Sequence, residues 1–214
     1  MQLINLLVGG PTAEWPAALK HGQIVGPWIG ADRGNLRLLK LGIIPQLAIG
    51  DFDSMTHQEF MGMKNQVPEL RIFDTHKDNT DTELALKIAL DHFHARHIHI
   101  YGATGGRIDH FLSNLFMVLE PRFRKFAERV ILIDRKNTIS FYLPGRHRID
   151  KEPDKKYLAF IPLGGMHVSL SHVEYPLDHH GIGFPRSYSS NEFIGNYAKF
   201  NFDRNVMCVI QSKD

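Results

Sequence analysis

The sequence has little that would support disulfide chemistry, secretion or membrane insertion. Its 214 residues include one cysteine, Cys208, so no internal disulfide can form. Cys208 lies in the apolar run 206–210, which predicts a buried, unreactive thiol on a strand. No apolar stretch approaches membrane-spanning length, and the first ten residues lack the basic head of a signal peptide. We therefore expect a cytoplasmic protein with no membrane partner.

An excess of charge of one sign is also lacking. The 25 basic and 23 acidic residues give a formal net charge of +2, which does not favour a nucleic-acid partner. The Walker A motif, the Gly-x-Ser-x-Gly elbow and His-Glu-x-x-His are all absent from the chain. The histidines at 92–99 and 179–180 have no cysteine or close carboxylate to complete a zinc site. Triad hydrolases and zinc enzymes are therefore not indicated.

The first part of the chain alternates short apolar runs with helix-like segments, which is typical of a parallel sheet covered on both faces. Helical spacing occurs at 36–41, 82–93 and, most clearly, 108–119, where an apolar stripe runs until Pro121 ends the helix. Strands are predicted at residues 3–8, 24–29, 45–49, 70–73 and 97–101.

After residue 129 the pattern changes to closely spaced strand-like runs with no convincing helix. These runs cover residues 130–134, 138–143, 157–162, 167–170, 193–202 and 206–211. We expect a two-domain α/β protein: an open, mostly parallel sheet with flanking helices in residues 1–128, and an all-β sandwich or barrel in residues 129–214.

Four acidic or glycine-rich motifs follow predicted strands of the first domain. They span residues 30–34, 50–54, 78–81 and 102–110. In an open parallel sheet the carboxyl ends of the strands share one edge, and ligands bind in the crevice there. The sequence therefore predicts that these motifs meet in one site.

Asp51 and Asp53 follow the apolar run 47–49 and are two residues apart. If the chain stays extended, both carboxylates point to one side and can hold a hard cation. The alternative is an ordinary turn in which Asp and Ser bond their own backbone.

A third carboxylate, from Asp78 or Asp81, would complete a magnesium site whose remaining ligands are waters and phosphates. Thr80 with Glu83 fits a capping box, and Asp81 suits either capping of the helix or metal ligation.

Residues 102–106 are glycine-rich and precede a predicted helix start, where free amides and the helix dipole attract phosphate. Arg107 adds a bidentate donor, and Asp109 could serve the helix dipole or orient a cation or a hydroxyl. A tight structural turn is the alternative. In the second domain, the polar cluster 189–193 is either a turn or a site whose donors and acceptors bind a small polar ring.

Five ordered motifs together resemble the thiamine pyrophosphokinase (thiamine diphosphokinase) family. They are Asp32-Arg33-Gly34, Gly50-Asp51-Phe52-Asp53-Ser54, Asp78-x-Thr80-Asp81, Gly105-Gly106-Arg107-x-Asp109-His110 and Ser190-Asn191-Glu192-Phe193. The resemblance covers nearly the whole chain. Many members have Asp-Gly-Gly where this chain has Asp32-Arg33-Gly34, so Arg33 could contact phosphate instead.

The resemblance implies a catalytic α/β domain, a thiamine-binding β-sandwich, and a homodimer with shared active sites that takes ATP, Mg²⁺ and thiamine. Its implied roles are these: catalysis by Asp51, Asp53, Asp81, Arg107 and Asp109; metal binding by Asp51, Asp53, Asp78 and Asp81; ATP or phosphate binding by Asp32, Arg33, Asp78, Thr80, Gly105, Gly106 and Arg107; thiamine binding by Ser190 and Asn191.

The expected reaction transfers the β,γ-pyrophosphoryl group of ATP to the hydroxyl of thiamine, giving thiamine diphosphate and AMP. The rivals are a non-catalytic nucleotide sensor and a metal-dependent phosphohydrolase, because clustered aspartates around magnesium can also activate water.

Overall fold

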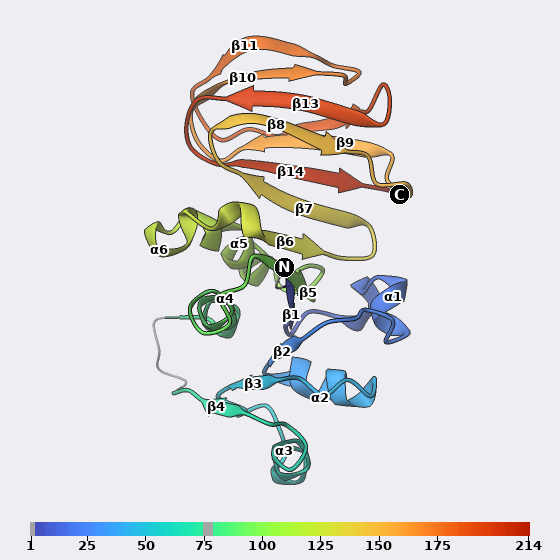
Figure 1. The fold of residues 1–214 in the computed structure, drawn as a ribbon, viewed down its shortest axis with the longest axis vertical. Coiled ribbons are helices and arrows are strands. Elements are labelled where there is room, and N and C mark those ends of the chain that lie inside the picture. Colours follow the sequence, from blue (N-terminus) through green and yellow to red (C-terminus); the bar gives the residue numbers. More distant parts are fainter. Residues whose placement is uncertain (1–2, 75–78) are drawn as a thin grey trace. The chain divides into compact units, whose positions relative to one another are not determined.

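The computed structural model describes residues 3–74 and 79–214, and the chain divides into two compact units (Figure 1). Unit 1 contains residues up to Met117 together with Leu132–Arg135, and unit 2 contains Val118–Ile131 and Lys136–Asp214. The domain boundary expected between residues 128 and 129 stays a prediction. Asp78 lies outside the described residues.

Unit 1 contains five parallel strands in the order β5-β1-β2-β3-β4. The central strands are buried on both faces, which explains their nearly continuous apolar sequence. The predicted parallel sheet is therefore confirmed. The strands are β1 (Leu3–Leu7), β2 (Trp28–Ala31), β3 (Leu47–Gly50), β4 (Leu70–Ile72) and β5 (His97–Tyr101).

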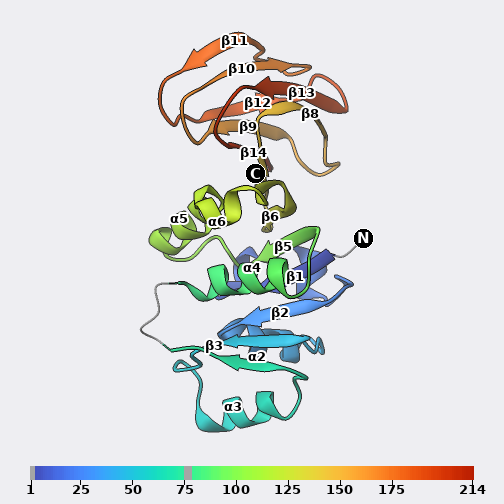
Figure 2. The same cartoon turned by 60° about the vertical axis from the view of Figure 1, so that its left-hand side comes forward.

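Helices cover both faces of this sheet. Figures 1 and 2 show α4 on one face and α2 on the other, and Figure 1 shows α1 on the side of α2. On the side of α1 and α2, Trp15 and Leu19 pack with Trp28 and Leu38 in one buried cluster. The helical segments are η1 (Thr12–Glu14), α1 (Ala17–Lys20), α2 (Arg33–Lys40), α3 (His57–Lys64), α4 (Asp81–Asp91), α5 (Ile108–Phe116) and η2 (Met117–Leu119). No helix in the described ranges is long and apolar enough to cross a membrane.

Helix α5 begins at the predicted residue but presents its apolar stripe outward. Ile108 is 75% exposed, Leu112 39% and Phe116 45%, whereas the polar Asn114 is buried. The helical stretch predicted at 108–119 is present as α5 followed directly by η2. Pro121 does not act as its terminator but begins α6 (Pro121–Arg124), where the missing amide of proline costs nothing.

Unit 2 is built mainly from antiparallel strands, after the short segments α6 and η3 (Ala127–Arg129). One set runs in the order β12-β9-β14-β7, and a separate four-stranded sheet runs in the order β11-β10-β13-β8. Strand β6 (Val130–Ile133) has residues in both units. The strands of unit 2 are β7 (Asn137–Tyr142), β8 (Gly145–Asp150), β9 (Tyr157–Pro162), β10 (Met166–Ser171), β11 (Leu177–Ile182), β12 (Tyr188–Glu192), β13 (Tyr197–Phe202) and β14 (Met207–Ser212).

The core of unit 2 contains side chains from both sets of strands. Leu158 and Phe160 of β9 share one buried cluster with Val168 of β10 and Phe200 of β13. Two sheets that bury a common core form a sandwich, as predicted. Cys208 is fully buried on β14, and burial raises its pKa to about 12, so the expected inert thiol is confirmed.

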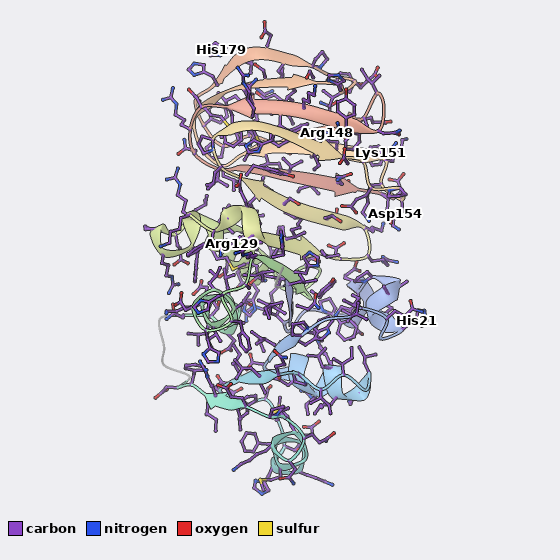
Figure 3. The ribbon with its side chains drawn as sticks, viewed as in Figure 1. His21, Arg129, Arg148, Lys151, Asp154 and His179 are labelled. Atoms are coloured by element: carbon purple, nitrogen blue, oxygen red, sulfur yellow. The ribbon has the colours of Figure 1, made fainter. Side chains whose placement is uncertain are left out.

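Strands β8, β11 and β12 were not predicted from the sequence. Their residues are mostly polar, and those of β8 and β11 are mostly exposed, so these strands lack the alternating apolar pattern of a strand. Strands β8 and β11 form the two edges of the four-stranded sheet, where Arg148 and His179 are labelled in Figure 3. Charged and polar side chains are typical of sheet edges because they discourage pairing with other chains.

Candidate functional site

Unit 1 contains a cavity of about 590 Å³ at the carboxyl ends of its parallel strands. The ends of β1, β2, β3 and β5 and the first turns of α2, α4 and α5 form its wall. The predicted convergence of the strand-end motifs is therefore present. The lining residues are Val8, Gly9, Gly10, Pro11, Ala31, Asp32, Arg33, Asp51, Ser54, Asn79, Thr80, Asp81, Thr82, Gly102, Ala103, Thr104, Gly106, Arg107, His110, Phe111, Ser113 and Asn114.

Asp32 occupies a strained position at the cavity wall. It precedes α2 with φ +46° and ψ −125°, a conformation that L-residues rarely adopt. Its amide donates to the carbonyl of Ile49 at 2.9 Å, which joins the exits of β2 and β3. A Cβ at Gly50 would lie 2.2 Å from Oδ1 of Asp32, so the carboxylate of Asp32 sits directly over the backbone that leads to Asp51.

Asn35 joins the same two strand exits from inside α2. It is fully buried, and its Nδ2 donates to the carbonyl of Asp32 at 3.0 Å and to that of Ile49 at 3.4 Å. Its Oδ1 occupies the space beside Gly30, where an added Cβ would come within 2.0 Å. This packing fixes the loops that carry Asp32 and Asp51.

Asp51 and Asp53 lie in a turn, not in extended chain. Strand β3 ends at Gly50, and Phe52 has φ +58°. Oδ1 of Asp51 accepts a hydrogen bond from the amide of Asp53 at 3.1 Å, which is the turn chemistry considered as the alternative. Asp51 lines the cavity, whereas Asp53 is exposed and is not one of the lining residues.

The start of α4 brings Thr80 and Asp81 to the cavity. The predicted capping box is confirmed: Oγ1 of Thr80 accepts from the amide of Glu83 at 3.2 Å, and Oε2 of Glu83 accepts from the amide of Thr80 at 3.1 Å. Asp81 is the first helical residue and also lines the cavity, so its position suits both roles considered for it.

Arg107 lines the cavity at the start of α5 and pairs with Asp109, which does not line it. Nε of Arg107 donates to Oδ1 of Asp109 at 3.1 Å. This hydrogen bond lowers the pKa of Asp109 and raises the pKa of Arg107. Gly106 lines the cavity, and Gly105, with φ +78°, lies beside it in the turn.

Two polar contacts, one buried and one part-buried, hold the glycine-rich loop in place. Nδ2 of Asn114 donates to the carbonyl of Ala103 at 3.0 Å, and Oγ1 of Thr104 donates to Oδ2 of Asp134 at 2.7 Å. The hydrogen bond to Ala103 therefore explains why α5 buries Asn114, although Ile108, Leu112 and Phe116 of the same helix are exposed.

The second group of predicted residues lies in unit 2. Ser190 is exposed and has φ +60°, at an irregularity in the pairing of β12 with β9. Asn191 is buried, and its amide group makes two hydrogen bonds of 3.0 Å with the backbone N–H and carbonyl of Tyr175. Asn191 thus shapes the backbone of this segment, and Ser190 presents its hydroxyl to solvent.

The donor chemistry of the cavity suits a hard cation. Carboxylates from Asp32, Asp51 and Asp81 line the same space, and oxygen ligands are those that Mg²⁺ prefers. Within residues 3–74 and 79–214, no three His, Cys, Asp or Glu side chains form a group that could hold a metal by themselves. The carboxylates of the described residues therefore form no complete metal site, and an ion here would need waters or substrate oxygens as further ligands.

Sequence reasoning missed the part of the wall that follows β1, residues 8–11, and the inner face of α5 around Ser113 and Asn114. The glycine pair Gly9-Gly10 directly after a buried strand was a usable signal for the first. An asparagine within an apolar helical pattern was the signal for the second.

Comparisons with known proteins identify the family of the chain. Residues 25–132 match the family model described as "Thiamin pyrophosphokinase, catalytic domain", and residues 146–207 match "Thiamin pyrophosphokinase, vitamin B1 binding domain". The chain is 37% identical to a thiamine pyrophosphokinase of Bacillus subtilis, over all of both sequences.

Solved structures give the same result. A thiamin pyrophosphokinase family protein from Enterococcus faecalis is 41% identical and superposes with a TM-score of 0.93, with both chains fully covered. A thiamin pyrophosphokinase from Geobacillus thermodenitrificans is 31% identical with a TM-score of 0.84, over 100% of this chain and 98% of that one.

Proposed function

The chain belongs to the thiamin pyrophosphokinase family and is a thiamine diphosphokinase, and we propose that the cavity of unit 1 is where it holds ATP. The observation that supports this placement most is the convergence of three aspartates, two glycine-rich loops and two arginines on one wall. Carboxylates and guanidiniums together are what a magnesium triphosphate requires, since the metal neutralises part of the charge and the arginines bind the remaining phosphate oxygens.

We propose Mg²⁺ as the cofactor, held on the protein side by Asp51 and by Asp81 or Asp78. Asp53 is exposed in the turn next to Asp51 and does not line the cavity, and we propose that it adds negative charge near the ion. When bound, the ion would supply charge neutralisation on the triphosphate. Asp32 would orient the carboxylate of Asp51, because the Asp32 carboxylate packs against Gly50, the residue before Asp51.

The phosphate groups are assigned to the donors around α2 and α5. Arg33, Arg107, Thr80 and the turn Gly105-Gly106 would hold oxygens that gain charge as the reaction proceeds. The hydroxyl oxygen of thiamine forms a bond to the β-phosphorus of ATP, the bond from that phosphorus to the bridging oxygen of AMP breaks, and the hydroxyl proton leaves to a nearby carboxylate or water. Asp109, paired with Arg107, orients the guanidinium.

We propose that thiamine contacts Ser190, which is exposed, and that Asn191 keeps the Ser190 segment in shape. A homodimer with shared active sites is also proposed. The exposed apolar residues Ile108, Leu112 and Phe116 on α5 support it, because an apolar stripe of this kind favours burial against a second copy. We also propose a cytoplasmic location, because the reaction consumes ATP.

The test is to incubate the protein with Mg²⁺, ATP and thiamine and to measure AMP. We expect AMP only when thiamine is present and only before the metal is chelated. AMP without thiamine would support a phosphohydrolase, and ATP binding without AMP would support a sensor.

Asp51→Asn should lose most of the turnover without unfolding. Asp91→Asn is the matched control: Asp91 is exposed on α4, pairs with Lys87 at 2.6 Å and does not line the cavity. Equal activity of the two variants would contradict the assignment of Asp51. Light scattering of the wild type and of Leu112→Glu tests the dimer, which should dissociate in the variant.

A further inference from the structure

The loop after β1, residues 9–11, is fixed tightly against the loop after β5. The amide of Val8 donates to the carbonyl of Tyr101 at 3.0 Å, and the amide of Gly10 donates to the carbonyl of Gly102 at 2.8 Å. A Cβ at Gly10 would lie 2.2 Å from the carbonyl oxygen of Gly102. The fold itself therefore requires glycine at position 10.

Gly9 is different, because the described part of the chain gives no reason for a glycine there. Its φ lies outside the left-handed region, and an added Cβ would meet nothing within 4 Å. Gly9 is exposed and lines the cavity. Glycine loses more conformational freedom on folding than any other residue, so its presence at an unconstrained position calls for another cause.

Arg37 of α2 binds the backbone carbonyls of this loop. Its Nη1 donates to the carbonyl of Gly9 at 3.0 Å and to that of Gly10 at 2.6 Å, and its guanidinium lies 6.0 Å from the ring centre of Trp15. Both acceptors are neutral carbonyls. Burial, and then the charge of Arg33, lower the pKa of Arg37, because both disfavour its charged form.

Together with Arg33 and Arg107 in the wall, Arg37 adds positive charge beside the cavity. An anionic ligand that comes close to the backbone of the loop would offset the repulsion between Arg33 and Arg37. The missing side chain at Gly9 leaves the room for that approach.

We propose that Gly9 is a contact position for the nucleotide, where the backbone itself meets ATP, and that Arg37 is the positioning residue that holds Gly9 there. This inference rests on the proposed function, because it takes ATP as the ligand of the cavity. It adds the loop after β1 to a site that the sequence motifs alone place at β2, β3, α4 and α5.

The test compares Gly9→Ala, Arg37→Met and Arg37→Lys with the control Gly62→Ala. Gly62 lies on α3, does not line the cavity, and also has open space for a Cβ. We expect Gly9→Ala to raise the Michaelis constant and the dissociation constant for magnesium-ATP about tenfold, with the constant for thiamine and the melting temperature unchanged. Arg37→Met should weaken ATP about tenfold as well, and Arg37→Lys should restore part of the affinity.

An ATP dissociation constant for Gly9→Ala equal to that of the wild type and of Gly62→Ala would overturn the inference. Failure of Gly9→Ala to fold would overturn it too, because the fold would then be the cause of the glycine. Calorimetric measurement of ATP binding distinguishes a failure of this inference from a failure of the proposed function. If the wild type binds ATP but makes no AMP with thiamine, the catalytic assignment fails while a weaker Gly9→Ala still supports the contact. If the wild type does not bind ATP, both fail.

Discussion

Two capping boxes within residues 3–74 and 79–214 allow the structural and functional roles of Thr80 to be measured separately. Thr80 with Glu83 caps α4 at the cavity, and Thr56 with Glu59 caps α3 outside it, with the same pattern of hydrogen bonds. Alanine at an N-cap removes one acceptor for a helix amide and costs about 1 kcal/mol. We expect about 0.5–1 kcal/mol for Thr56→Ala, which is exposed, and about 1–2 kcal/mol for Thr80→Ala, where the partner Glu83 is buried.

Only Thr80→Ala should also affect the reaction. It removes a hydroxyl from the cavity wall, so the Michaelis constant for ATP should rise about tenfold, as expected for loss of a hydrogen bond to a charged group. Thr80→Ser should retain both properties. Thermal unfolding measures the loss of stability from the lost cap, where about 1 kcal/mol corresponds to a change of about 2–4 °C in the melting temperature. Steady-state AMP production measures the Michaelis constant for ATP. If Thr56→Ala and Thr80→Ala changed the ATP constant equally, helix capping alone would explain both and the contact would be refuted.

Three further predictions concern other parts of the chain. Burial, and then the charge of His97, lower the pKa of His99, so the unfolded state binds more protons than the folded state below about pH 6.5. Between pH 7 and pH 5 the melting temperature of the wild type should therefore fall more than that of His99→Gln. An equal fall of the two melting temperatures would contradict this. Phe160 is 1% exposed in the core of unit 2, so Phe160→Ala should lower the free energy of unfolding by about 3–5 kcal/mol in denaturant titrations. Asn191→Ala should cost about 1–3 kcal/mol because it removes the side-chain partner of three backbone groups, the N–H and carbonyl of Tyr175 and the N–H of Glu192. Ser190→Ala should instead raise the Michaelis constant for thiamine at an unchanged melting temperature, and the reverse pattern would exchange their roles.

The parallel sheet could be predicted because strands that are buried on both faces have nearly continuous apolar sequences. Strands β1 and β5 consist almost entirely of buried or half-buried residues, and their predicted positions differ from the observed ones by one residue at most. Strand β2 was expected at residues 24–29 but begins at Trp28, after Gly26 and Pro27, and continues into Gly30 and Ala31. Glycine at the end of that strand suggested a loop, although the strand is buried to its last residue.

Elements whose role depends on other parts of the structure could not be predicted in the same way. Helix α3 buries only Met63, so its apolar pattern was too weak, although its capping box was visible in the sequence. The convergence of the strand-end motifs followed from topology alone, which is why Asp32, Asp51, Asp81 and Arg107 were placed together correctly. The conformation of each loop did not follow, because positive φ at Asp32 and Phe52 depends on contacts between strands that no local pattern records.

The contact between Gly30 and Asn35 has a consequence for how this site varies among related sequences. An added methyl group at position 30 would occupy the place of the asparagine oxygen, 2.0 Å away. Positions 30 and 35 should therefore covary: homologues with alanine or serine at the first ought to carry a shorter side chain at the second. A variant library should therefore randomise the two positions together, because a larger residue at position 30 alone would displace the Asn35 amide that holds the loops of Asp32 and Asp51.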